Sequence, residues 1–172
     1  MEQAVILKPH DVALLVKLLV KDGQDWKQMD IAQELGLSQG EVAKALVRLK
    51  KAMLVNGKRV NHQAALEFLV HAIKYVFPVE PGPLAFGIPT GISSPAHEKM
   101  VVQSGEDVYV WPHPAGKKRG QIIRPFYANL AEAALKDRKF YDMMAAIEIL
   151  RVGRARERNL AVKYLEKELK HP

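Results

Sequence analysis

Residues 30–51, DIAQELGLSQGEVAKALVRLKK, decide the fold of this chain, because they predict two short helices joined by a tight turn. The first helix ends at Gly36, a residue that readily adopts the left-handed conformation found at helix ends. Ser38 and Glu41 then match the S-x-x-E pattern of a capping box, which starts a second helix. Together these signals predict a helix-turn-helix.

The second helix of this pair has two contrasting faces. Apolar residues recur along it at helical spacing, which predicts a buried stripe made of Val42, Ala45, Leu46, Leu49 and Met53. The opposite face combines small and cationic residues, namely Gly40, Ala43, Lys44, Val47 and Lys51, flanked by Gln39 and Arg48. We expect this second face to point into solvent.

The chemistry of the outward face suits the major groove of DNA. Small side chains let the helix come close to the base edges, where Ala43 and Val47 fit thymine methyl groups. Gln39 can pair with adenine, while Lys44 and Arg48 can reach guanine or phosphate. The plain alternative is a surface helix with solvated cations. The turn that precedes the helix favours DNA binding.

Composition narrows the classes of protein. A length of 172 residues allows one large domain or two small ones, and a hydrophobic content of 48% allows a proper core. The chain has no cysteine, so disulfides, thiol catalysis and thiolate metal sites are excluded. No long apolar run or signal-peptide pattern occurs, so we expect a cytoplasmic protein that does not enter a membrane. The net charge of +7 weakly favours polyanion partners.

The segments on either side of the helix-turn-helix complete a three-helix unit with a hairpin. A first helix is expected over residues 8–21, with Pro9 in its first turn, and Trp26 is expected to pack under the motif. Asn56 and Gly57 are a strong hairpin signal, because both tolerate positive φ. The hairpin would form a β-wing with Lys58 and Arg59 at or beside its tip, against DNA backbone. An ordinary hydrophilic turn is the alternative.

Residues 8–77, under half of the chain, resemble a known family. The run 35–49, LGLSQGEVAKALVRL, followed by Met53-Leu54-Val55 and a basic turn, is similar to the winged helix-turn-helix of bacterial transcriptional regulators, notably the MarR-like class. The resemblance implies that the second helix of the motif reads the major groove and that the wing touches phosphates. It also implies DNA contacts for Ser38, Gln39, Gly40, Lys44, Arg48, Lys58 and Arg59. Gly40 departs from the Ser or Thr often found in that family.

The middle of the chain is irregular in composition. Residues 61–77 read as one helix with a broad apolar face that needs cover on more than one side. Eight of the next eighteen residues, 78–95, are Pro or Gly, so we expect an ordered extended loop without a long strand. A β-hairpin is expected over 101–114 with its turn at 104–107. Segment 116–120, GKKRG, is expected to be a basic loop that either touches DNA phosphates beside the wing or is solvated.

The remainder is helical. A short helix is expected near 127–135, a second one capped by Asp137, and a last one over 154–170 with an interruption near Gly153. Three interpretations fit the arginines at the second junction: a phosphate contact, a surface for an acidic partner, or solvated side chains paired with local glutamates, which we favour. These arginines are Arg151, Arg154, Arg156 and Arg158. His62 and His71, on one helix, are taken as structural, and His97 and His113 are taken as turn and surface residues.

The second half also resembles an uncharacterised group of small bacterial winged-helix proteins with a Pro/Gly-rich middle and a segment LRVGRARER, here at 150–158. In that group the gene can lie beside a nucleotidyltransferase-type toxin gene. The resemblance therefore implies an antitoxin or an autorepressor.

These observations give one expectation for the whole chain. It is mainly α with a small β component, divided into a winged helix-turn-helix over 1–77, a Pro/Gly-rich segment over 78–125 and a helical region over 126–172. We expect a dimeric repressor that binds double-stranded DNA without cofactor or metal; the alternative is an antitoxin that neutralises a partner protein through its C-terminal half. No catalytic constellation is found, so an enzyme is not expected. The DNA-binding candidates are Ser38, Gln39, Gly40, Lys44, Arg48, Lys51, Lys58 and Arg59.

Overall fold

The computed structural model describes residues 4–100 and 108–170, and these residues are mainly α-helical with a small β component, as predicted. The N-terminal elements, in chain order, are α1 (Pro9–Val20), α2 (Gln28–Leu35), α3 (Gln39–Lys51), β1 (Val55–Asn56), β2 (Arg59–Val60), α4 (His62–His71) and α5 (Ile73–Val76). They are followed by β3 (Leu84–Thr90), a 3-10 turn η1 (Gly91–Ser93), β4 (Tyr109–Pro112), β5 (Lys118–Ile122), α6 (Leu130–Lys136), α7 (Arg138–Val152) and α8 (Ala155–Lys170).

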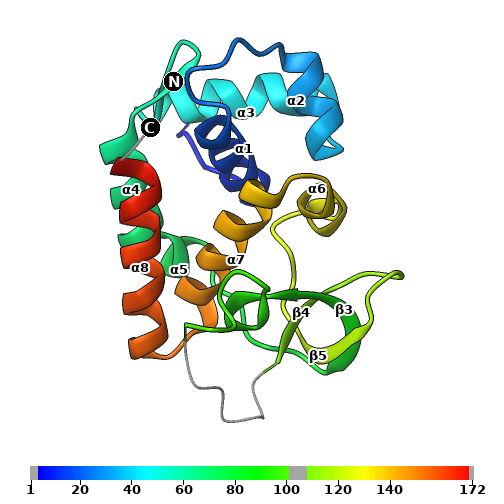
Figure 1. Ribbon diagram of the computed structural model, residues 1–172. Helices are drawn as coiled ribbons and strands as arrows, with labels where there is room; N and C mark the ends of the chain where they lie inside the picture. Colours follow the sequence, from blue (N-terminus) through cyan, green and yellow to red (C-terminus); the bar gives the residue numbers. More distant parts are fainter. Residues whose placement is uncertain (1–3, 101–107, 171–172) are drawn as a thin grey trace.

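The first three helices and the β1–β2 hairpin form one end of the molecule, and the small sheet lies at the other end (Figure 1). Trp26 is buried in the hydrophobic core, as expected. Helix α7 runs through the middle and contacts α1, α5, α6 and α8. The buried apolar side chains of all three sequence segments join in one continuous cluster, which extends from Val12 in α1 to Leu169 in α8.

A buried lysine ties the N-terminal helices to α7. The ammonium of Lys17 lies 2.6 Å from Asp137 and 3.2 Å from Glu34, and its side chain is 1% exposed. It also sits 4.8 Å above the ring of Phe140. Asp137 caps α7 as predicted, accepting from the Phe140 amide. Burial alone would raise the pKa of Asp137, but the hydrogen bond from Lys17 holds it below its usual value.

The segment expected to lack a long strand contains one, so that prediction is wrong. Strand β3 has seven residues and pairs antiparallel with both β4 and β5, which pair with each other in parallel to close a three-stranded barrel. Part of the predicted basic loop, including Lys118 and Arg119, belongs to β5. Strand β4 confirms the strand expected near Trp111, whereas the turn expected at 104–107 lies outside the described residues.

Glycines make so small a barrel feasible. A Cβ atom at Gly87 would lie 2.1 Å from the carbonyl oxygen of Trp111, and one at Gly116 would lie 2.2 Å from the Cα of Gly87. The backbones therefore approach where only glycine fits. Gly87, one of the residues from which we predicted the absence of a long strand, therefore permits strand β3.

The helix expected over 61–77 is divided at Ala72, where φ is −111°, into α4 and the single turn α5. Helix α4 packs against α8 within the same chain. His62 joins them, with one ring nitrogen 2.8 Å from the carbonyl of Leu169 and the other 2.8 Å from Asp22. The broad apolar face expected for 61–77 is therefore partly covered by α8 of the same chain.

The arginines at the α7–α8 junction differ in their surroundings, and Arg151 is not solvated. Its guanidinium donates to Glu148 at 2.7 Å and to the carbonyl of Phe77 at 2.9 Å, and it stacks 4.0 Å from the centre of the Phe126 ring. Glu148 is fully buried and also accepts from Trp111 Nε1 at 3.1 Å. Burial raises the pKa of Glu148, and the charge of Arg151 opposes that shift. This pair is structural.

The expected surface position of His97 is wrong, because its side chain is fully buried. Its Nε2 lies 2.8 Å from the carbonyl of Asp142, which can only accept, so Nε2 carries the proton. Its Nδ1 has no hydrogen-bond partner within the described residues, and the ring lies edge-on to Tyr164. Burial lowers the pKa of His97, so the ring is held neutral. His113, also expected at the surface, is partly buried and lies 2.6 Å from Glu132.

We expect His97 to make the protein less stable in mild acid. The folded state resists protonation, whereas the unfolded chain takes up a proton near pH 6.5, so stability is complete above that pH and is lost as pH falls. The loss is at most about 1.4 kcal/mol for each pH unit below 6.5, down to the folded pKa. The free energy of unfolding, measured in urea between pH 7.5 and 5, should therefore fall more steeply with decreasing pH in wild type than in His97→Gln. The control is His71→Gln, at an exposed histidine, which should behave like wild type. Equal slopes in all three would contradict the prediction.

Two further features are absent from the described residues. No helix in residues 4–100 or 108–170 combines the length and the apolarity needed to cross a membrane. No group of three metal-ligating side chains is found in that part of the chain either.

Candidate nucleic-acid interface

The turn between α2 and α3 is fixed by local signals and by one distant segment. Gly36 has φ +68°, and the amides of Gly36 and Leu37 bond back to the carbonyls of Gln33 and Ala32, closing α2 with a Schellman motif. From the segment before α6, Tyr127 donates to the carbonyl of Leu35 at 2.7 Å, and the Asn129 amide donates to that of Gly36 at 2.8 Å. The turn is therefore held from two sides.

The start of α3 is the predicted capping box. The Glu41 amide donates to Ser38 Oγ at 3.1 Å, and the Ser38 amide donates to the Glu41 carboxylate at 2.7 Å. The hydrogen bond from the Ser38 backbone holds the pKa of Glu41 below its usual value. Four of the five residues expected in the buried stripe are buried, namely Val42, Ala45, Leu46 and Leu49, and they set the rotation of the helix about its axis.

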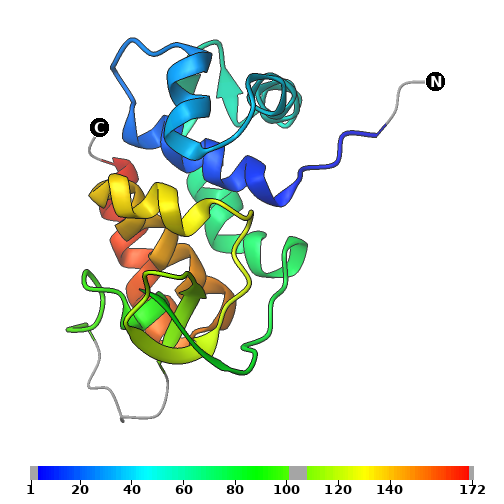
Figure 2. The same ribbon diagram turned by 90° about the vertical axis from the view of Figure 1, so that its right-hand side faces the viewer.

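The opposite face of α3 points into solvent, as predicted. Val47 is 53% exposed, and the other exposed residues of this face are Gln39, Gly40, Lys44 and Lys51, with Ala43 half-buried among them. Lys44 and Lys51 make no hydrogen bond or ion pair with any described residue. Helix α3 lies at the outer edge of the molecule in both views (Figures 1 and 2). A cationic surface with small side chains is therefore open along the whole helix.

Arg48, expected to reach DNA, is engaged elsewhere. Its Nε and Nη2 each lie 2.7 Å from one oxygen of Asp11, and Nη2 also lies 3.2 Å from His10 Nε2. Asp11 is 1% exposed and accepts from the Lys8 amide as part of the cap of α1. This fork-to-fork pair joins α3 to the start of α1. The geometry thus makes Arg48 a structural residue and corrects its predicted role.

The hairpin after α3 is short, and its two basic residues differ. Asn56 pairs with Arg59, so the two-residue loop is Gly57-Lys58, one position later than expected. Lys58 does not project freely, because its ammonium lies 2.5 Å from Asp25 and 2.9 Å from the carbonyl of Trp26. Arg59 is exposed and has no hydrogen bond or ion pair within the described residues. Of the predicted wing cations, only Arg59 is available without breaking a contact.

Helix α3 ends in a strained cap beside this surface. The amides of Met53 and Leu54 bond back to the carbonyls of Lys50 and Leu49, which is again a Schellman motif, but the left-handed position is occupied by Met53 with φ +63°. Met53 is 75% exposed, so its expected place in the buried stripe is wrong, and Leu54 is buried instead. The left-handed cap ends the helix and moves the buried position by one residue, from Met53 to Leu54.

We expect Met53→Gly to stabilise the protein. A left-handed conformation costs a non-glycine residue about 1–2 kcal/mol, and the exposed methionine side chain contributes little packing. After subtracting the larger entropy that glycine loses on folding, a gain of about 0.5 kcal/mol remains. A higher urea midpoint at unchanged slope would support this prediction. The control is Val47→Gly, which places a glycine inside the helix and should lower the midpoint. A lower midpoint for Met53→Gly would contradict it.

The basic segment at Lys117, Lys118 and Arg119 is far from this surface. Both views place the barrel at the end of the molecule opposite α3 (Figures 1 and 2). The three side chains are exposed. The segment therefore does not lie beside the β1–β2 hairpin.

The interface that remains is smaller than the predicted one. The structure brings Ser38, Gln39, Gly40, Lys44 and Lys51 together on α3 and places Arg59 on the neighbouring hairpin, while Arg48 and Lys58 are held by acids. Lys50 is a further exposed cation on α3 that the sequence interpretation left out. Comparison of the chain with known protein families, with curated proteins and with solved structures finds no match.

Proposed function

We propose that this protein is a sequence-specific DNA-binding regulator of transcription, with α1, α2, α3 and the β1–β2 hairpin as a winged helix-turn-helix. The observation that carries the proposal is the open face of α3, where small residues lie between unpaired cations. A helix of this kind fits the major groove, which is about 12 Å wide. Gln39 and Lys44 would contact base edges, and Lys51 and Arg59 would contact phosphates.

The order of the elements and the resemblance to MarR-like regulators support the same proposal. Such proteins act as dimers on palindromic sites, because a two-fold axis relates two equal reading heads. We therefore propose a dimeric repressor.

Selection of bound duplexes from random DNA tests the proposal. We expect enrichment of an inverted repeat, with binding that weakens as salt rises. Failure to enrich any sequence over several rounds, with folded protein, would contradict sequence-specific binding.

A second candidate is a protein-interaction module such as an antitoxin, and one observation favours it. The barrel exposes two large apolar side chains, Leu84 at 56% and Phe86 at 60%, beside three exposed cations. Phe86 faces Arg119 across the paired strands. An acidic partner with an apolar anchor would suit this surface. Copurification of the neighbouring gene product, abolished by Phe86→Glu, would support it, and copurification unaffected by that change would not.

A further inference from the structure

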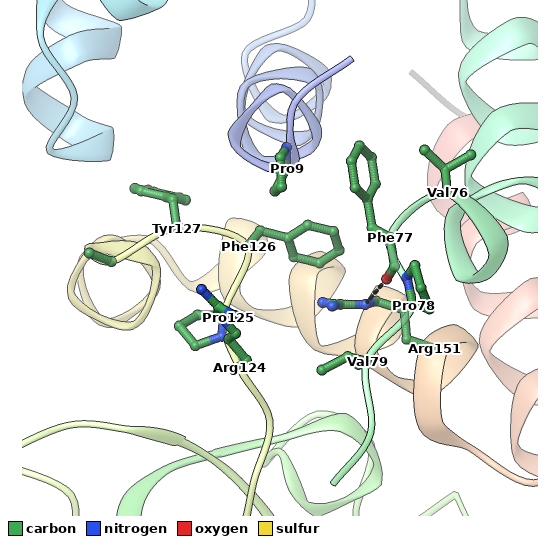
Figure 3. A pocket seen from close by; sticks show the side chains of 11 residues that line it. Pro9, Val76, Phe77, Pro78, Val79, Arg124, Pro125, Phe126, Tyr127 and Arg151 are labelled. Atoms are coloured by element: carbon green, nitrogen blue, oxygen red, sulfur yellow. Dashed lines mark hydrogen bonds between the residues drawn. The ribbon is translucent and has the colours of Figure 1, made fainter. Parts of the chain in front are cut away.

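A cleft of about 630 Å³ lies at the side of the molecule, between the start of α1, the end of α5 and the segment before α6. Its lining is mostly apolar, with Val76, Phe77 and Phe126 among the contributors (Figure 3). Phe77 and Phe126 meet edge-on at 6.2 Å, and Arg151 supports Phe126 from beneath. The cleft has the size of a ligand site but exposes apolar walls with few polar groups directed at one point.

The segment that precedes α1 meets the rim of this cleft. Pro9, the first residue of α1, lines the cleft, and the described residues before it, 4–8, have no regular structure. We call residues 4–8 the N-terminal arm. Val5 is 43% exposed and Ile6 is 73% exposed, so two β-branched side chains stand in water next to an apolar hollow.

The arm does not fill the cleft of its own chain. Leu7 packs against the core, and the part of the arm before it runs away from the body on the side where α5 and the segment before α6 lie (Figure 2). Its five residues span roughly 17 Å when extended, enough to cross a narrow gap between two molecules. Val76, at the rim of the cleft, is itself 48% exposed, and the neighbouring Tyr75 is 73% exposed. The cleft and arm thus form one apolar area on one side.

We propose that the N-terminal arm of one molecule occupies this cleft in a second copy, and that two copies exchange arms around a two-fold axis. Each arm starts at the rim of its own cleft. When two molecules face each other with this side, each arm therefore lies over the partner's cleft. Such a contact is isologous and closes at two subunits. The proposal rests on the dimeric part of the proposed function and names its interface. Its test needs no DNA, so failure of this interface can be told apart from failure of DNA binding.

The absence of cysteine makes a direct test available. Ile6→Cys and Val76→Cys, prepared as separate chains and mixed, should be joined by a short bismaleimide into a heterodimer. Ile6→Cys mixed with Leu135→Cys, which is 50% exposed on α6, should not be joined. Equal yields in the two mixtures would overturn the proposal. So would a chain carrying both Ile6→Cys and Val76→Cys that gives only an internal link, because its arm would then fill its own cleft.

Light scattering of the full chain gives an independent measurement. Wild type at about 100 μM should be a dimer, and Ile6→Lys should weaken association about a hundredfold, because a cation replaces an apolar side chain beside Arg124 and Arg151. Met53→Lys, equally exposed but far from the cleft, should dimerise like wild type. A wild-type monomer, or a dimer unaffected by Ile6→Lys, would overturn the proposal. Circular dichroism should show every variant folded, since all the changed side chains are exposed.

Discussion

Arg48→Ala is expected to lower the free energy of unfolding by about 3 kcal/mol, because it leaves the buried carboxylate of Asp11 without its charged partner. Asp11 keeps the hydrogen bond from the Lys8 amide and the His10 ring nitrogen at 3.6 Å, but the ion pair that links α1 to α3 is lost. Urea unfolding measures the change. The prediction matters for function, since Arg48 looks in the sequence like one more cation of the DNA-facing helix.

The matched control is Lys44→Ala, four residues earlier on the same helix, where no ion pair is lost and stability should change by less than about 0.5 kcal/mol. The double variant Asp11→Asn with Arg48→Met should be more stable than Arg48→Ala, because no buried charge is left alone. If Arg48→Ala and Lys44→Ala unfold alike, the Asp11–Arg48 pair does not hold the helices together.

Val47→Glu is expected to weaken binding to the selected duplex about a hundredfold while leaving stability nearly unchanged. Val47 lies in the middle of the exposed face of α3, so the carboxylate would be brought against base edges and phosphates. Fluorescence anisotropy with a labelled duplex measures the dissociation constant. Because the side chain is half exposed, loss of packing cannot explain an effect of this size.

Leu84→Glu is the control for Val47→Glu. The side chain of Leu84 is 56% exposed, against 53% for Val47, and the substitution adds the same charge at the other end of the molecule. It should bind DNA within about twofold of wild type, the small change reflecting net charge alone. Equal losses for the two variants would show that only overall charge matters, and that α3 is not the contact surface.

The helix-turn-helix elements could be predicted because their signals are local. Gly36, Ser38 and Glu41 determine the turn and the cap within a few residues, and the apolar spacing determines which side of α3 is buried. The structural role of Arg48 could not be predicted from the sequence, because its partner Asp11 lies 37 residues away and no local sequence pattern indicates the ion pair. Lys58 was misjudged for the same reason, since Asp25 is 33 residues distant.

The barrel was missed for a different reason. Proline and glycine normally interrupt strands, and in 84–90 they do not, because Gly87 meets Trp111 where any side chain would collide. Each strand finds its partners through pairings distant in sequence, such as Phe86 with Arg119. Local propensity carries no information about such pairings. The helices of the C-terminal part, by contrast, follow from apolar spacing and from the cap at Asp137.

The central claim is that unpaired cations on and beside α3 neutralise DNA phosphates. The most direct test is the slope of log dissociation constant against log salt for wild type and for Lys51→Gln combined with Arg59→Gln. We predict that the slope falls by about two in the double variant, one for each lost contact. A double variant with the wild-type slope would show that DNA, if bound at all, lies on another surface.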